Sequence, residues 1–413
     1  MTPTTRGVVM LVICGVLYGL AWMTHIGWFY AANAVAVAIF LLNIPIPWLL
    51  LRGLSAKRST IAPGGGRSED VFEGDTISLA VELQNRLRAP TFLITIQEQC
   101  ALIAPDEEQP GFFVGMVASR GRVTASYDAR CYRRGVYSLG PILVETAAPF
   151  GLFCAQRLLD APLEVTVYPR VLAIGANVDR GSLEGRTPDA SPPVHSGEFR
   201  ASREYQQGDN VHNIHWRNSA RRGQLMVKEF DKVPQGEVRL AFNGELDLGA
   251  DRTSTLEYAI KIAASVARRC FLEGRPFQMW PRDQERPPST WRLVLEHLAR
   301  LPSGTPASIA EFLDHPTAPG ISVLIVSAAD RESFAQLTER QAPSPNMTVV
   351  LLQGFGPGES PYAAEKLVKM GIPVLPCGRD DLRATLDALG RRMLTSGPLA
   401  RTAPSATRQP VSS

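Results

Sequence analysis

Two uncharged apolar stretches dominate the beginning of the chain, Gly7–Met23 and Ala31–Leu51, separated by the segment THIGWFY. A membrane-spanning helix needs about 20 mostly apolar residues, so both stretches are predicted to span a membrane. The break between them leaves room only for a tight hairpin, with both ends on one side. A cleaved signal peptide at the first stretch is the alternative, and the second apolar stretch that follows at once argues against it.

Short runs of alternating apolar and polar residues come next and predict strands. Examples are VFEGDTISLAVELQN, TFLITIQEQC and LEVTVYPRV, with Gly, Pro or Asn turns between the runs. Several such strands over about 100 residues predict a β-sandwich. The preceding segment SAKRSTIAPGGGRSED is polar and rich in glycine, and we expect it to be a linker.

The pattern changes to alternating strands and helices from residue 237 onward. Thr255–Gly274 carries apolar residues at helical spacing, and apolar runs such as EVRLAFN, SVLIVSA and MTVVLLQ alternate with further amphipathic segments. This alternation predicts a parallel sheet covered by helices on both faces. The expected organisation is a membrane hairpin at 1–54, a linker at 55–70, a β-sandwich at 71–170, a loop and junction at 171–236, an α/β domain at 237–396 and a disordered tail at 397–413.

Net charge, the charges beside the hairpin and the cysteine content bear on the expected partners, the membrane orientation and the state of the thiols. The net charge is only +3, so no nucleic-acid partner is expected. Arg6 precedes the hairpin, while Arg52, Lys57 and Arg58 follow it, and the positive-inside rule therefore predicts a two-pass inner-membrane protein whose domains face the cytoplasm. Six scattered cysteines without a C-x-x-C pair predict buried, reduced thiols.

The densest stretch is REYQQGDNVHNIHWRNSARRGQLMVKEFD, residues 203–231. It resembles the signature of the domain-of-unknown-function 58 (DUF58) family of bacterial membrane proteins, R-x-Y-x-x-G-D-x-x-R-x-I-x-W-x-x-S-A-R. The matching positions are Arg203, Tyr205, Gly208, Asp209, Ile214, Trp216, Ser219, Ala220 and Arg221. The resemblance implies a membrane hairpin, a β-sandwich, a Rossmann-like domain of the von Willebrand factor type A kind, and association with a MoxR-type AAA+ ATPase. It implies no established enzymatic activity.

Two departures from the family pattern bear on chemistry. His212 stands where the signature often has arginine. Metal-binding type A domains carry D-x-S-x-S after the first strand, whereas Asn243 and Glu245 occupy the first two ligand positions here. The resemblance therefore implies no metal site and no cofactor. A glycine-rich run, LLQGFGPGES, is similar to a phosphate cradle, but Glu359 stands where a third glycine is required.

The signature is interpreted as a rigid junction between domains. In this interpretation Ile214 and Trp216 dock on a core face, while Arg203, Arg221 and nearby acids form a paired network. The predicted function is a non-enzymatic membrane scaffold or adaptor that acts through protein–protein interaction, in envelope-related assembly or protein maturation. Two alternatives stay open: a metal-assisted hydrolase using Asp209, His212 and His215, and a sensor of envelope ligands. The oligomeric state is not predicted.

Overall fold

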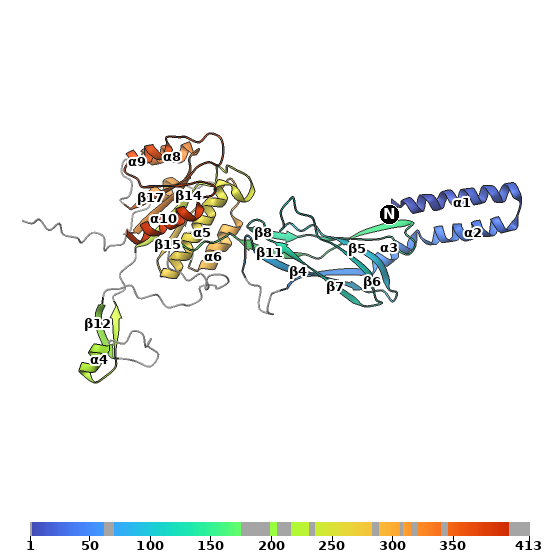
Figure 1. The fold of residues 1–413 in the computed structure, drawn as a ribbon, viewed down its shortest axis with the longest axis horizontal. Coiled ribbons are helices and arrows are strands. Elements are labelled where there is room, and N and C mark those ends of the chain that lie inside the picture. The colour runs from blue at the N-terminus through green and yellow to red at the C-terminus, as the bar shows by residue number, and fades with distance from the viewer. Residues whose placement is uncertain are drawn as a thin grey trace, which may run out of the picture. The chain divides into compact units, whose positions relative to one another are not determined.

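The computed structural model describes residues 2–61, 70–174, 199–204, 216–230, 236–282, 289–305, 309–314, 320–339 and 346–395. The chain divides into two compact units, Met1–Tyr168 and Pro169–Ser413, and each is described by itself (Figure 1). The division lies beside the boundary expected at residue 170.

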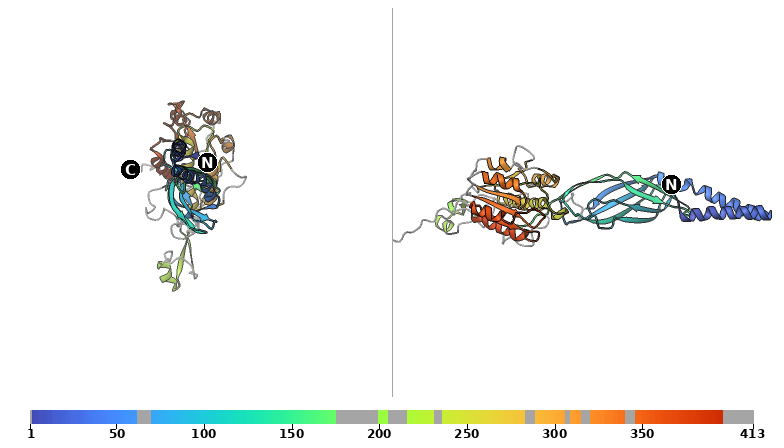
Figure 2. Two further views of the ribbon diagram at one scale, coloured as in Figure 1. Left: turned by 90° about the vertical axis from the view of Figure 1, so that its right-hand side faces the viewer. Right: turned by 90° about the horizontal axis from the view of Figure 1, so that it is seen from above.

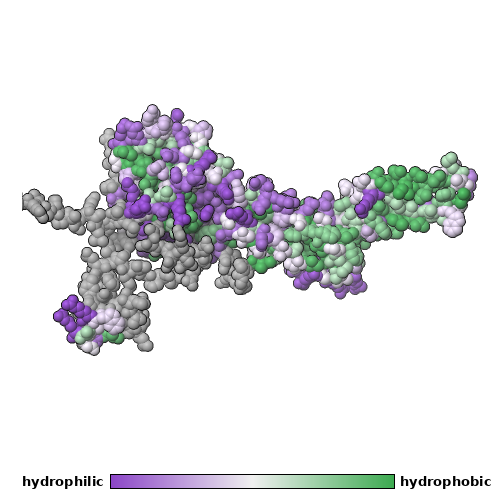
Figure 3. Space-filling model, viewed as in Figure 1, coloured by the Kyte–Doolittle hydropathy of each residue, from purple (hydrophilic) through white to green (hydrophobic). Residues whose placement is uncertain are grey.

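The first unit begins with a hairpin of two apolar helices, α1 (Thr5–Thr24) and α2 (Gly27–Leu42), which contact each other. His25 closes α1 in the left-handed region at φ 53°. By length and hydropathy, Thr5–Thr24 and Gly27–Arg52 could each span a membrane, and the hairpin surface is largely hydrophobic (Figure 3). The prediction of two apolar helices is confirmed, while their orientation in a membrane stays a prediction.

The rest of the first unit consists of short strands and the helix α3 (Pro45–Arg52). The strands are β1 (Thr2–Pro3), β2 (Leu54–Ile61), β3 (Val71–Phe72), β4 (Thr76–Asn85), β5 (Thr91–Gln97), β6 (Gly111–Val117), β7 (Arg122–Arg130), β8 (Gly135–Leu139), β9 (Ile142–Thr146), β10 (Phe153–Leu159) and β11 (Leu163–Tyr168). They form sheets in the orders β1-β10-β9-β5-β6, β2-β4-β7 and β3-β11-β8. Among the described strand pairings of this first unit, only β3–β11 is parallel.

Residues from two of these sheets share one hydrophobic cluster. Val81 and Leu83 on β4 lie in the same cluster as Ile94 and Ile96 on β5, and all four are almost fully buried. Alternation along each strand therefore points one set of side chains inward, as the sequence predicts. The β-sandwich class itself stays a prediction.

The prediction of a linker over residues 55–70 is wrong for residues 55–61. Leu54–Ile61 forms β2 and pairs with β4 from Leu54↔Asn85 to Ile61↔Ser78. The inward positions of β2 are Leu54, Ala56 and Arg58. Because the third inward side chain is a cation, the alternation of apolar and polar residues is hidden in the sequence.

Arg58 forms a buried ion pair with Glu98. Arg58 Nε lies 2.8 Å from Glu98 Oε1, and both side chains are completely buried. Arg58 Nη1 also donates to the carbonyls of Gly140 and Ala161, at 3.1 and 2.7 Å. Arg58 is therefore not a free charge beside the membrane, and the predicted orientation depends on Arg6, Arg52 and Lys57. Burial, together with the Glu98 carboxylate, raises the pKa of Tyr127 nearby.

The second unit contains a five-stranded parallel sheet in the order β15-β14-β16-β17-β18. Its strands are β14 (Glu237–Phe242), β15 (Phe277–Trp280), β16 (Gly320–Ser327), β17 (Met347–Leu352) and β18 (Val374–Cys377). Its helices are α5 (Thr255–Glu273), α6 (Trp291–Arg300), α7 (Ile309–Asp314), α8 (Arg331–Glu339), α9 (Ala363–Lys369) and α10 (Leu382–Thr395), with a 3₁₀ turn, η2, at Asp251–Thr253. Figure 2 shows helices on both sides of the sheet. The predicted parallel sheet is present, and its type A-like class stays a prediction.

Local sequence signals explain the bounds of α5. The Ser254 hydroxyl accepts a hydrogen bond from the Glu257 N–H at the beginning, and Gly274 adopts φ 67° at the end. Nearly the whole helix is buried, up to and including Cys270. Of the six cysteines, Cys14 and Cys154 are only partly buried, contrary to expectation.

The Arg58–Glu98 pair generates a stability prediction. Arg58→Met should cost about 3–5 kcal/mol, because it leaves the Glu98 carboxylate buried without its partner. Arg122→Met, which breaks an exposed pair with Glu82, should cost no more than about 1 kcal/mol. Urea unfolding followed by maleimide labelling of Cys131 measures both, since that thiol is fully buried and burial raises its pKa to about 12. Equal losses in the two variants would contradict this account of the pair.

Candidate functional site

The described part of the signature forms a small antiparallel ribbon with a helix. β12 (Phe199–Glu204) pairs with β13 (Met226–Phe230), and α4 (Trp216–Arg222) precedes β13. We call β12, α4 and β13 the signature arm. The strand predicted within QLMVKEF is confirmed as β13.

Ser219 explains one signature position structurally. Its buried hydroxyl accepts a hydrogen bond from the Met226 N–H at 2.9 Å, which joins α4 to β13. Its carbonyl accepts from the Gly223 N–H at 2.9 Å, and Gly223 adopts φ 71°, a conformation that suits glycine at the end of a helix. Ser219 and Gly223 therefore set the turn between helix and strand.

Trp216 begins the helix α4, so the strand assumed at this position is wrong, while the docking of Ile214 and Trp216 on a core face stays a prediction. The exposed fraction of Trp216 is 68%, and Leu225 is also exposed at 47%. The prediction assumed strand alternation, but α4 begins at Trp216. In a helix, Trp216 shares a face with Ala220 one turn later, and Ala220 is exposed as well. Arg217 and Arg221 are exposed beside them.

Other signature positions lie outside the described residues: Tyr205, Gly208, Asp209, His212, Ile214 and His215. The alternative metal site at Asp209, His212 and His215 lies there too. Arg203 stands opposite Val227 in the β12–β13 ladder, and its side chain is not among those described. Over the described ranges, no three His, Cys, Asp or Glu side chains are grouped so as to hold a metal ion.

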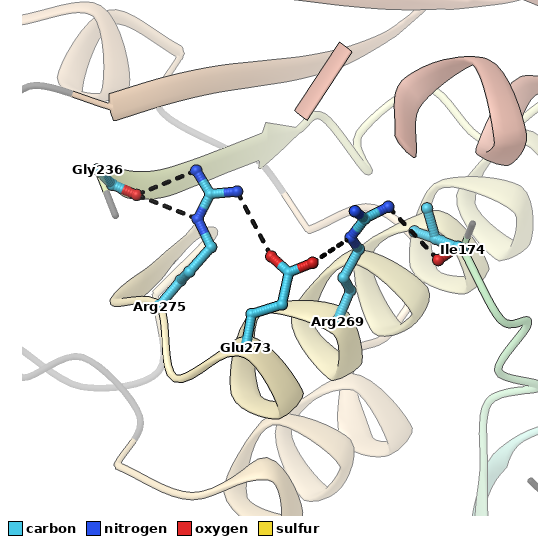
Figure 4. Close-up of polar contacts among 5 residues, drawn as sticks. All are labelled: Ile174, Gly236, Arg269, Glu273 and Arg275. Atoms are coloured by element: carbon cyan, nitrogen blue, oxygen red, sulfur yellow. Dashed lines mark hydrogen bonds and ion pairs between the residues drawn. The ribbon is translucent and has the colours of Figure 1, made fainter. Parts of the chain in front are cut away.

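The two flanks of residues 175–235 are held by a network at the end of α5 (Figure 4). Arg269 Nη1 donates to the Ile174 carbonyl at 3.4 Å, and Arg275 donates to the Gly236 carbonyl from Nε and Nη2, at 3.4 and 3.3 Å. Glu273 joins the two arginines: Oε1 lies 2.7 Å from Arg269 Nε, and Oε2 lies 3.6 Å from Arg275 Nη1. We call this network the Glu273 clamp.

Because its arginine side chains are buried, the Glu273 clamp contributes more to stability than a surface ion pair does. The side chains of Arg269 and Arg275 are 11% and 7% exposed, and that of Glu273 is 29% exposed. A further hydrogen bond, from the Leu172 N–H to the Ser265 hydroxyl at 3.0 Å, fixes the first flank to α5. The described residues on either side of 175–235 are thus both fixed at the C-terminal part of α5 and the turn that follows it. The i,i+4 spacing of Arg269 and Glu273 was visible in the sequence, but its carbonyl partners were not.

A second polar cluster lies where β14 and β16 end. In the order β15-β14-β16-β17 the chain leaves β14 toward β15 and leaves β16 in the opposite direction, toward β17, and in such sheets ligands bind at the carboxyl ends of these two strands. Asn243 Nδ2 donates to Asp330 Oδ2 at 3.0 Å, and the Ser333 hydroxyl donates to the same oxygen. Asn243 Oδ1 accepts from the Glu245 N–H at 3.1 Å. Both the nitrogen and the oxygen of the Asn243 amide are therefore engaged in hydrogen bonds within the fold.

The glycine-rich loop after β17 is filled by its own carboxylate. The N–H groups of Gly354, Phe355 and Gly356 donate to the Glu359 side chain at 2.6, 2.7 and 3.2 Å. Such a concave row of N–H groups is a common anion-binding arrangement. Glu359, noted in the sequence as a departure from the glycine motif, occupies the position that a phosphate would take.

The Glu273 clamp predicts a local effect of neutralising one residue. Glu273→Gln keeps the shape but removes the charge that joins the two arginines, so a loss of about 1–3 kcal/mol is expected. Amide hydrogen exchange should accelerate at Leu172 and in the first residues of β14. Glu296→Gln on α6 is the matched control, because Glu296 forms an exposed i,i+4 pair with Arg292 at 3.2 Å. Unchanged exchange in Glu273→Gln would contradict the clamp.

The Asn243–Asp330 contact generates a prediction about metal binding. Asn243→Asp removes a donor and places two carboxylates together, which should cost about 1–3 kcal/mol. Mg²⁺, which favours carboxylate oxygens, should raise the melting temperature of this variant and leave that of the wild type unchanged. Asn346→Asp is the control, since the side chain of exposed Asn346 donates to the Gly320 carbonyl and not to a carboxylate in the described part of the chain. A wild-type melting temperature that rises by several degrees with Mg²⁺ would sink the prediction.

Comparison with solved structures gives only weak similarity. The chain is similar to red sea bream transglutaminase at 16% identity over 28% of this chain and 15% of that one, with a TM-score of 0.20. It is similar to the bacterial hydrophobin BslA at 8% identity over 28% of this chain and 97% of that one, with a TM-score of 0.19. These values carry no conclusion about fold or function.

Comparison with known families and curated proteins is more specific. The family described as protein of unknown function DUF58 matches residues 201–308. The uncharacterized protein YeaD of Bacillus subtilis (strain 168) is 28% identical over 207 residues, which cover 47% of this chain and 51% of YeaD. The chain thus matches about half the length of this relative. The resemblance predicted from the signature is confirmed to this extent: the chain matches the DUF58 family over residues 201–308, which include most of the signature arm and the arginines and glutamate of the Glu273 clamp.

Proposed function

We propose that the protein is a membrane-anchored cytoplasmic scaffold or adaptor that works with a MoxR-type AAA+ ATPase in envelope-related assembly or protein maturation. The observation that carries this proposal is the exposure of Trp216, at 68%, within the segment that the DUF58 family matches. The ATPase partner comes from the family resemblance. The proposed contact surface is the exposed face of α4.

The composition of this face suits a protein partner. Trp216 and Ala220 supply an apolar centre, and Arg217 and Arg221 flank it. Tryptophan and arginine are enriched among the residues that contribute most to protein–protein binding. A partner with an apolar pocket surrounded by acidic groups would complement this face, because it would bury the indole and pair the guanidinium groups.

Membrane anchorage is supported by the helical hairpin and its flanking charges. α1 is 20 residues long and uncharged apart from Arg6 near its beginning. Arg52 lies at the end of α3, with its guanidinium 5.1 Å from the Trp48 ring centre, and Lys57 is exposed on β2. These cations favour a cytoplasmic location for both ends of the hairpin.

The finer fold classes are part of the proposal. The hydrophobic cluster shared between β4 and β5 supports a β-sandwich in the first unit. The parallel sheet and the Asn243–Asp330 contact beyond β14 and β16 support a type A-like domain whose metal position is taken by an amide. In this proposal the second unit displays the signature arm and does not perform chemistry.

Trp216→Ala is the direct test of the contact surface. Recovery of the MoxR-type ATPase with the tagged full-length chain from native membranes should fall at least about tenfold, as expected when a dominant interface residue is truncated. The melting temperature should hardly change, because the indole is exposed. Quantitative mass spectrometry of the co-purified ATPase measures the binding.

Leu293→Ala provides the matched control, because Leu293 is an exposed apolar residue on α6, at 45%. Its recovery of the ATPase should equal that of the wild type. Equal recovery with Trp216→Ala would remove the basis of the proposal, and so would absence of the ATPase from the wild-type preparation.

A further inference from the structure

A cavity of about 320 Å³ lies in the first unit where α1 begins. Its polar lining includes Arg6, Thr95 and Glu145, and its other walls include Leu93, Phe150 and Cys154. This volume is at the lower end of the range for small-molecule sites, roughly 300–1,000 Å³. The cavity is open on one side, and it plays no part in the function proposed above.

The beginning of α1 is fixed to the turn between β9 and β10. The Thr4 N–H donates to the Leu152 carbonyl at 3.0 Å, and the Thr4 hydroxyl bonds to the carbonyls of Gly151 and Leu152. A β-carbon at Gly7 would collide with the Leu152 carbonyl oxygen, so only glycine permits this approach. The Arg6 side chain lies at the same junction, with Nη1 3.4 Å from where a β-carbon on Gly151 would lie.

The level at which the cavity lies relative to the membrane follows from the length of α1. This step rests on the membrane anchorage proposed above. Twenty residues at 1.5 Å each span roughly 30 Å, the thickness of the hydrocarbon layer. A helix that begins at Thr5 therefore places Arg6 at the level of the lipid headgroups. Phe150 and Leu93, which are 60% and 47% exposed, provide apolar contacts at the same level.

Two opposite charges line the cavity without pairing with each other. Neither an ion pair nor a hydrogen bond involves the Arg6 side chain in the described part of the chain. Glu145 Oε1 accepts from Gln156 Nε2 at 2.6 Å, which orients the carboxylate. A ligand that carries both an anion and a cation would satisfy both groups at once.

We propose that this cavity binds the headgroup of a zwitterionic phospholipid with a primary ammonium, such as phosphatidylethanolamine. The phosphate lies against the Arg6 guanidinium, and the ammonium donates to Glu145 and to the Thr95 hydroxyl. A purely anionic headgroup would leave Glu145 facing a like charge. A quaternary ammonium has no N–H to donate and favours several aromatic faces, whereas Phe150 is the one aromatic residue of this lining.

Lipid retention by the full-length chain tests the proposal. The protein is reconstituted into bilayers with equal amounts of phosphatidylethanolamine, phosphatidylglycerol and phosphatidylcholine, extracted, and analysed by native mass spectrometry. The wild type should retain phosphatidylethanolamine in preference to the other two by roughly tenfold, the effect of one charge-assisted hydrogen bond. Glu145→Gln should abolish this preference. Arg6→Gln should lower the retention of all three lipids, because each carries the phosphate, and Arg6→Lys should keep part of that retention.

Matched controls come from the exposed Arg122–Glu82 pair of the same unit, whose atoms lie 3.3 Å apart. Arg122→Gln and Glu82→Gln should retain the wild-type preference. Preference for phosphatidylglycerol, an unchanged preference in Glu145→Gln, or equal loss in the controls would each overturn the proposal.

Two further readouts distinguish a bound lipid from a soluble ligand and from a failure of the membrane anchor. Water-soluble phosphoethanolamine at millimolar concentration should not displace the lipid, and full displacement would overturn the proposal in favour of a soluble ligand. If the membrane anchorage itself fails, the protein will not enter the bilayer in any lipid mixture. A protein that inserts but retains no lipid selectively overturns the headgroup site alone.

Discussion

The carboxylate of Glu273 is the interaction on which the attachment of Ile174 and Gly236, the two described flanks of residues 175–235, to the end of α5 depends. It accepts from Arg269 at 2.7 Å and lies 3.6 Å from Arg275, and these arginines hold the Ile174 and Gly236 carbonyls on either side of residues 175–235. Two guanidinium groups so close together repel each other, and the shared carboxylate makes their proximity favourable. Both described flanks are therefore fixed at the end of one well-packed helix.

Several other charged groups have contacts that serve the fold. Arg58 and Glu98 pair inside the first unit, Asp330 is engaged by Asn243, and the Glu359 carboxylate fills the glycine-rich loop. Each of these positions would otherwise be a candidate for binding an ion or a phosphate. The exposed face of α4 is different, because Trp216 is left to solvent. This contrast favours a protein partner at the arm over chemistry at the edge of the sheet.

Strong periodicity made much of the fold predictable from sequence. The two apolar helices, the parallel strands and the capped helix α5 were all expected, because each combines a long apolar pattern with clear end signals. β2 was missed because its inward Arg58 interrupts the alternation, and only a distant partner, Glu98, makes that arrangement stable. Trp216 was misplaced because its surroundings fit a strand or a helix equally well. The Glu273 clamp could not be foreseen, since two of its partners are backbone carbonyls.

Site-specific photocrosslinking in native membranes tests the central claim most directly. A photoreactive amino acid is placed at position 216 on α4 and, for comparison, at position 293 on α6. The account predicts a crosslink from position 216 to a MoxR-type AAA+ ATPase and none from position 293. Crosslinks from position 216 only to the chain itself, or equal crosslinks to the ATPase from both positions, would contradict it.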